Sequence, residues 1–345
     1  MSSGIARYTH KIVLQLRRFL PIIAWLPAYQ RADLRPDLLA GAISWAVMVP
    51  VAMAYAEMAG LPAQAGLYAS MASLIAYFLF GTSRHQKVLA SSTMAVMSAA
   101  VIALLAGGDL AAYASLSAAL ALTVGILLVL AGIVKLGFIS DFLSKSAIVG
   151  FVFGLAINIV VSQAPKLFGV PGGNGSTIQQ FFQLLFKLGM TNPWTLAISI
   201  TSLAIVIFLR VRYRRIPPAP VVLVYGILVV SLLNLAEKGV GVVGVVPTGL
   251  PQLSWPDLTF GDAIYLVIGA LGIIFLAVGE SLGTARAYAA KYDYLIDSNQ
   301  ELVALGAANV SAGLLQGFTI DASLSQTATA EQAGARSFPR SCRRC

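Results

Sequence analysis

Apolar runs close to twenty residues long recur along this chain, and they constrain its fold more than any other feature. A helix needs about twenty apolar residues to cross the hydrocarbon core of a bilayer, where the backbone must satisfy its own hydrogen bonds. Only 11% of the residues are charged, whereas soluble domains carry about 25%. The sequence therefore predicts an all-α polytopic membrane protein, with spans at roughly 38–56, 64–80, 92–106, 113–134, 145–164, 194–209, 217–235, 262–285 and 300–316 and a last short helix from about 322.

Basic residues gather at one side of the predicted spans. Arg84 and Lys87, the basic run at 210–215, and Arg286 and Lys291 all fall on the same side as the basic N-terminus. Because lysine and arginine accumulate in cytoplasmic loops, this pattern predicts a multi-pass protein of the inner or plasma membrane with a cytoplasmic N-terminus. Topology also accounts for the net charge of +9. The expected partner is therefore the lipid bilayer and not nucleic acid.

The two ends of the chain differ from its apolar middle. Residues 1–37 are predicted to be a cytoplasmic segment in which residues 5–20 form a basic amphipathic helix on the membrane surface, with a solvated basic leader as the alternative. This segment lacks the pattern of a cleavable signal peptide. Residues 338–345 are an atypical basic tail that holds both cysteines, Cys342 and Cys345, so we expect no disulfide framework.

Two short helices are predicted to begin with small hydroxylated residues. The stretches ASST at 90–93 and ASLS at 322–325 each lead into an alanine-rich helix. The first N–H groups of a helix lack an intrahelical acceptor and carry partial positive charge, so such starts attract anions. In the predicted topology the two helices run in opposite directions, and their N-termini face each other. This is the arrangement of an inverted-repeat transporter with a site near the bilayer midplane.

Short matches to enzyme signatures lack the context that those signatures need. The stretch Gly279–Gly283 fits G-x-S-x-G, but it lies inside an apolar helical run, and neither His10 nor His85 follows Ser281. The stretch GVGVVG at 239–244 follows a helix instead of a strand. The C-x-x-C of the tail has no second pair. The sequence thus predicts no enzymatic activity, no cofactor and no metal site.

Glu280 is the carboxyl group that stands out within a predicted span. A carboxylate there costs roughly 2.5–3.5 kcal/mol on insertion scales and usually faces a cavity or a partner. Glu280 could carry a proton through a transport cycle, and Thr284, one turn further on, could help it to ligate a small cation such as Na⁺. The alternative is that Glu280 lies near the membrane surface and pairs with Arg286 or Lys291.

Five spaced motifs stand in order along the chain, at 54–70, 81–85, 280–289, 293–310 and 334–337. Together they resemble the SulP family of sulfate permease-like anion transporters, and the resemblance covers about residues 35 to 337. In that family two seven-span inverted repeats form a core and a gate domain, the anion site lies between two facing half-helices, and a cytoplasmic STAS domain usually follows.

The resemblance implies a set of site residues. Tyr55 of the first span would line the anion site together with the starts of the two half-helices, and Glu280 would take the place of the coupling carboxylate. The implied anion-site residues at the half-helix starts are Ser92, Thr93, Met94, Ser323 and Ser325.

Three positions depart from the family pattern in ways that bear on the anion. The usual Gly-Pro of the third span is Ser92-Thr93, the glutamine after the first-span proline is Val51, and the arginine of the tenth helix is Gln326. Without that glutamine and that fixed positive charge, sulfate loses two expected ligands. Bicarbonate and chloride therefore stay open as alternatives.

The family pattern stops at Ser337. Residues 38–337 would make an incomplete transport domain of about ten spans, without the last four spans of the second repeat and without a STAS domain, as in a truncated or frameshifted product. The predicted function is secondary active transport of an inorganic anion coupled to a proton or Na⁺, with a homodimer in the full-length form. The alternative is a non-transporting membrane fragment or assembly partner.

Overall fold

The computed structural model describes residues 20–106, 109–138, 145–173, 177–213, 216, 218–242, 249, 253, 255–256 and 260–332. The chain divides into two compact units, one formed by Met1–Ser144 with Thr248–Cys345 and the other by Lys145–Pro247. The first unit contains α2 (Ile22–Trp25), η1 (Leu26–Ala28), η2 (Arg31–Asp33), α3 (Leu34–Met58), α4 (Ala63–Phe80), β1 (Val88–Leu89), α5 (Ser92–Ile102), α6 (Leu110–Ile133), η3 (Leu136–Phe138), α12 (Phe260–Tyr292), α13 (Ser298–Leu314), β2 (Asp321–Ala322) and α14 (Leu324–Gln332). The second contains α8 (Lys145–Phe168), α9 (Thr177–Lys187), η4 (Leu188–Met190), α10 (Pro193–Arg212) and α11 (Pro218–Leu232).

Each helix expected between residue 38 and the short helix from about 322 is present, with some shifted ends. The helix α5 stops at Ile102 instead of 106, so its 11 residues span only about 16 Å. In the other direction α12 continues past 285 to Tyr292. The amphipathic helix expected at 5–20 and the tail at 338–345 lie outside the described residues. The helices with the length and hydropathy to cross a membrane, among the described residues, are Arg31–Met58, Ala63–Phe80, Ala112–Ile133, Pro193–Arg212 and Gly261–Tyr292.

Two features of the fold were not predicted. One is α9, an amphipathic helix of 11 residues in the second unit that packs on α8. The other is the two-stranded antiparallel sheet formed by β1 and β2. Each strand has only two residues, so the all-α class stands, but these strands lie directly before the two short helices α5 and α14.

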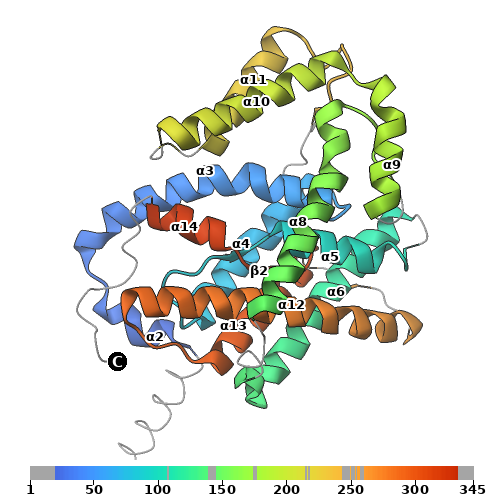
Figure 1. The fold of residues 1–345 in the computed structure, drawn as a ribbon. Coiled ribbons are helices and arrows are strands. Elements are labelled where there is room, and N and C mark those ends of the chain that lie inside the picture. The colour runs from blue at the N-terminus through green and yellow to red at the C-terminus, as the bar shows by residue number, and fades with distance from the viewer. Residues whose placement is uncertain are drawn as a thin grey trace, which may run out of the picture. The chain divides into compact units, whose positions relative to one another are not determined.

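In the first unit, α13 forms the centre of the core and packs against α6 and α4 (Figure 1). The contact with α6 depends on small residues, because a Cβ atom at Gly306 would lie 2.6 Å from the carbonyl oxygen of Gly125. Helices in membranes associate through such close approaches, since apolar burial alone does not favour contact with a helix over contact with lipid. The close contact of α6 and α13 gives the first unit a rigid centre.

Glu301, in the first turn of α13, ties this centre to the loop that follows α4. It is 2% exposed. Its carboxylate accepts hydrogen bonds from the amides of Thr82 and Ser83, each at 2.7 Å, and from the Tyr77 hydroxyl at 2.6 Å. Charge-assisted bonds of this kind are stronger than neutral ones. They fix the path of the chain between α4 and β1.

The second unit is organised around the start of α10. Asn192 caps this helix by accepting hydrogen bonds from the amides of Trp194 and Thr195, and Pro193 occupies the first helical position. The Asn192 side chain also donates to the carbonyl of Lys238, which follows α11. Since α10 packs on both α8 and α11, this cap anchors the turn that joins the helices of the unit.

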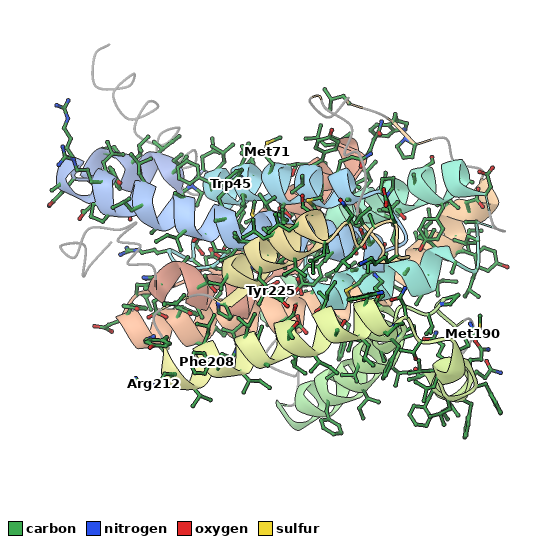
Figure 2. The ribbon with its side chains drawn as sticks, turned by 90° about the horizontal axis from the view of Figure 1, so that it is seen from above. Trp45, Met71, Met190, Phe208, Arg212 and Tyr225 are labelled. Atoms are coloured by element: carbon green, nitrogen blue, oxygen red, sulfur yellow. The ribbon has the colours of Figure 1, made fainter. Side chains whose placement is uncertain are left out.

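Large apolar side chains cover the outer faces of both units. Figure 2 shows Trp45 on α3, Met71 on α4 and Phe208 on α10 projecting away from their helices, and their exposed fractions are 64%, 41% and 59%. In water such surfaces would associate. In a bilayer they are the faces that meet lipid, which fits the membrane-spanning lengths of these helices.

Candidate anion and coupling site

The starts of α5 and α14 are brought together by the β1–β2 sheet. The strands pair antiparallel with Val88 opposite Ala322 and Leu89 opposite Asp321. The Ser323 amide extends the pairing by donating to the Lys87 carbonyl at 3.0 Å. Each strand ends within three residues of a helix start, so the N-termini of both short helices lie at the same place. This confirms the facing half-helices expected from the sequence.

Helices on three sides hold this sheet. From α4, the Ser73 hydroxyl donates to the Val88 carbonyl at 3.0 Å. From α13, the Asn309 side chain donates to the Ile320 carbonyl and accepts from the Ile320 amide, both at 3.0 Å. From α12, the Ser281 hydroxyl accepts from the strand amide of residue 322 at 3.1 Å. A two-stranded ribbon is marginal by itself, so these anchors determine where the helix starts lie.

Both helix starts carry a serine cap of the same kind. The Ser91 hydroxyl accepts from the Met94 amide at 3.2 Å, and the Ser323 hydroxyl accepts from the Gln326 amide at 3.3 Å. These caps satisfy one orphan amide of each helix. The amides that precede them, at residues 92–93 and 324–325, have no acceptor within their own helix. These amides form two sets of hydrogen-bond donors, one at the start of α5 and one at the start of α14, and the strand pairing brings the two sets close together.

The predicted anion-site residues lie at this place, with different side-chain environments. Ser92 and Thr93 are partly exposed, whereas the Met94 side chain is fully buried in the core. Tyr55, from the C-terminal half of α3, interacts through its hydroxyl with Ser92. Ser323 directly precedes α14 and is partly exposed. Ser325 lies in the first turn of α14, and its side chain is outside the described part of the chain.

The predicted coupling residues lie on α12, next to β2. Glu280 is partly buried, and Thr284, one turn further on, is 6% exposed. Glu280 interacts with Asp321 of β2. Of the two cations in the alternative, Lys291 forms an ion pair with Glu331 at 2.5 Å, and Arg286 donates to the Ser298 hydroxyl at 3.1 Å.

Asp321 is the site residue that sequence analysis missed. It lies on β2, opposite Leu89, and is fully buried. Its carboxyl group interacts electrostatically with Glu280 and with Tyr55. In the sequence it looks like an ordinary acidic residue before a short helix, and only the strand pairing places it inside the core.

The loop before β1 carries a second polar cluster, centred on His85. Its ring stacks on Tyr292 with the ring centres 4.1 Å apart, and on Tyr288 and Tyr294 at longer range. Burial of the ring is the largest cause of a lowered pKa for His85. The imidazole is therefore expected to stay neutral among the tyrosines and to resist protonation.

The fold and site define a class of membrane protein: helical, with two half-helices whose N-termini meet in the core. A sequence model of the Sulfate permease family matches residues 34–338. The chain belongs to the Sulfate permease family.

Individual relatives agree with this assignment. A probable sulfate transporter of Mycobacterium tuberculosis is 37% identical over 92% of this chain and 56% of its own length. Solute carrier family 26 member 6 of Homo sapiens is 32% identical over 93% of this chain and 46% of its own length. The chain therefore spans about half the length of these relatives. Both relatives are transporters by name.

Solved structures support the same fold. The murine solute carrier 26 family member A9 anion transporter in the inward-facing state matches with a TM-score of 0.85 and 26% identity, covering 94% of this chain and 57% of that chain. The transmembrane domain of a cyanobacterium bicarbonate transporter matches with a TM-score of 0.79 and 24% identity, covering 89% of this chain and 79% of that chain. These matches confirm the partial inverted-repeat transporter fold.

Proposed function

We propose that the chain supplies the anion-binding core of a secondary transporter for an inorganic anion. The carrying observation is the β1–β2 pairing, which brings the N-termini of α5 and α14 to one place. Donors that are already aimed at one point need no reorganisation to bind an anion, and helix N-termini stabilise negative charge. The ligands would be the free amides and the hydroxyls of Ser92, Thr93, Ser323 and Ser325, with Tyr55 beside them.

The charge of the site bears on which anion it binds. Position 326 at the start of α14, where the resemblance leads one to expect an arginine, is a neutral glutamine that is 6% exposed. Neutral donors alone suit a small anion such as chloride or bicarbonate, and sulfate remains the other candidate because relatives are named as sulfate transporters. A competition experiment that measures the relative affinities of the chain for chloride, bicarbonate and sulfate would distinguish these candidates.

Glu280 and Thr284 are proposed as the residues that couple anion movement to a cation gradient. Glu280 lies on α12 beside β2, and α12 is bonded to β2 through Ser281. A carboxyl group in this position would change its protonation or its cation binding when an anion binds at the two helix starts. The coupling ion would be a proton or Na⁺. The cytoplasmic N-terminus and a dimer of the longer protein stay predictions.

Anion binding by the purified chain in lipid nanodiscs tests the first proposal. The chain should be titrated with chloride, bicarbonate and sulfate, and binding followed by thermal stabilisation. Thr93→Val should weaken binding by roughly 10- to 150-fold, since a hydrogen bond to a charged group contributes about 1.5–3 kcal/mol. Thr123→Val is the matched control, because this threonine bonds within α6 to the Ala119 carbonyl. Equal affinity in the two variants would refute the placement of the anion.

Vesicle transport tests the coupling and separates the alternative function. Uptake driven by a proton or Na⁺ gradient should be lost in Glu280→Gln, and unchanged uptake would show that Glu280 does not couple. A chain that binds the anion but gives no flux above empty vesicles would favour the alternative, a non-transporting fragment or assembly partner. Binding is therefore measured before flux.

A further inference from the structure

A buried carboxyl group without a hydrogen-bond partner lies on β2. Asp321 is 0% exposed, and among the described residues neither of its carboxyl oxygens has a hydrogen-bond partner. An ionised carboxylate in such a place carries a large desolvation cost unless a cation or strong donors compensate it. Native proteins rarely leave a buried polar group in this state without a function. The Asp321 carboxyl group therefore requires compensation for its charge if it is ionised.

A second carboxyl group, Glu280, lies against Asp321. Ser281 follows Glu280 in the sequence, and Ala322 follows Asp321. The Ser281 hydroxyl accepts a hydrogen bond from the Ala322 amide at 3.1 Å, so the residues next to the two acids are in direct contact. Glu280 is the main charged group that acts on Asp321, and Tyr55 of α3 is the other titratable group that faces it. The site thus holds two acids beside the hydroxyl of Tyr55 and that of Ser91, the cap of α5, which also interacts with the Asp321 carboxyl group.

Cations on the neighbouring elements interact with other groups. Lys87, which directly precedes β1, interacts with Asp37 of α3. Lys291, on the same helix as Glu280, pairs with Glu331 of α14, and the Arg286 guanidinium donates to Ser298. Within the described residues, no cluster of three histidine, cysteine or acidic side chains is placed to hold a metal ion. Two adjacent carboxylates in a low-dielectric site cannot both stay ionised without compensation, and the smallest compensating ion is a proton.

We propose that Asp321 and Glu280 form a carboxyl pair that holds one proton between them, as the proton-binding site of this core. On loading, a proton from water binds one carboxylate oxygen, and the resulting O–H donates to the other carboxylate. On release the same O–H bond breaks and the proton returns to water, so nothing else is consumed. This rests on the proposed function and deepens it, because it names a proton as the coupling ion and Asp321 as a second member of the site.

The proton would also tune the anion site. Asp321 lies two residues before Ser323 and opposite Leu89, three residues before Ser92. Each loaded proton therefore removes one negative charge close to both helix starts. Like charges repel most strongly where the dielectric is low, so the protonated pair favours an anion in the site and the deprotonated pair opposes it. Binding of the two ions is then coupled, and the coupling is reciprocal.

Infrared spectroscopy of the chain in nanodiscs tests the pair directly. The C=O stretch of a protonated carboxyl group, and its shift in D₂O, should be present at neutral pH and disappear at alkaline pH. Asp321→Asn and Glu280→Gln should each change this band, and the double variant should abolish it. Asp293→Asn is the matched control, because this acid is exposed in a loop at positive φ, where asparagine is also tolerated. It should leave the band unchanged.

The outcomes distinguish this proposal from the anion proposal. Absence of a protonated carboxyl band from the unmodified chain at neutral pH would overturn the pair, and so would removal of the band by Na⁺ at constant pH. Both observations are made on the unmodified chain, so neither depends on whether a variant folds. A band that responds to Asp321→Asn while chloride, bicarbonate and sulfate all fail to bind would keep the proton site and refute the anion site. The reverse result would keep the anion site alone.

Discussion

Glu301→Ala is expected to destabilise the first unit strongly. The carboxylate of Glu301 accepts from the amides of Thr82 and Ser83 and from the Tyr77 hydroxyl, and both Glu301 and Tyr77 are buried. Alanine leaves these three donors without their acceptor. Each buried unsatisfied donor costs about 1–3 kcal/mol, and water can reach the partly exposed Thr82. We therefore expect a loss of about 3–5 kcal/mol.

Thermal unfolding in detergent, followed by circular dichroism, measures this loss. For a unit of this size, 1 kcal/mol corresponds to about 2–4 °C, so the melting temperature should fall by roughly 10 °C. Glu301→Gln keeps an oxygen for the two amides and should fall between the wild type and the alanine variant. Glu237→Ala is the control, since this acid is exposed and surface charges contribute little to stability. Equal melting temperatures for Glu301→Ala and Glu237→Ala would refute the reasoning.

Three further changes test other parts of the structure. Gly306→Val should prevent the α6–α13 contact at Gly125 and cost more than about 3 kcal/mol, whereas Gly272→Ala, with open space around it, should be neutral in the same unfolding assay. Ser281→Ala removes the acceptor of a buried strand amide and should cost about 1–3 kcal/mol; covalent labelling of Ser281 by a serine-hydrolase probe would contradict its role as an anchor. The lowered pKa of His85 means that the unfolded chain binds a proton more readily near its ordinary value of 6.5, so stability should fall on acidification through that pH. His85→Phe keeps a stacked ring but cannot bind a proton, so its stability should not depend on pH in this way. Melting temperatures of both proteins measured across that pH range test this.

The membrane helices were predictable because lipid imposes a simple rule. A span needs a long apolar run, so the ends of α4 were predicted to within one residue and those of α10 to within three. The C-terminal end of α12 was not, because residues 286–292 carry polar side chains that continue the helix beyond the apolar run. The helix α9 was missed because it is short and amphipathic, with nothing in its length to suggest a span.

The candidate site was predictable only in part. Hydroxylated helix starts at 90–93 and 322–325 are visible in the sequence, and the structure does bring them together. The fully buried side chain of Met94 and the burial of Asp321 could not be predicted. Both depend on which strand residue faces which helix, and a two-residue strand has no periodicity to reveal its register. Residues separated by more than 200 positions meet here only through the fold.

The position of the two helix starts is set by residues that do not line them. Ser73, Ser281 and Asn309 come from α4, α12 and α13, and each bonds the backbone of the β1–β2 sheet or of the residue before it. Apart from a change to proline, no substitution removes a backbone donor at a helix start, so evolution alters an anion site of this kind mainly through its hydroxyls, its neighbouring charges or these anchors. An anchor moves both helix starts at once, whereas a hydroxyl changes one ligand. The carboxyl pair of Glu280 and Asp321 lies beside one of the anchors, which is why a charge change there can act on anion binding without touching the anion.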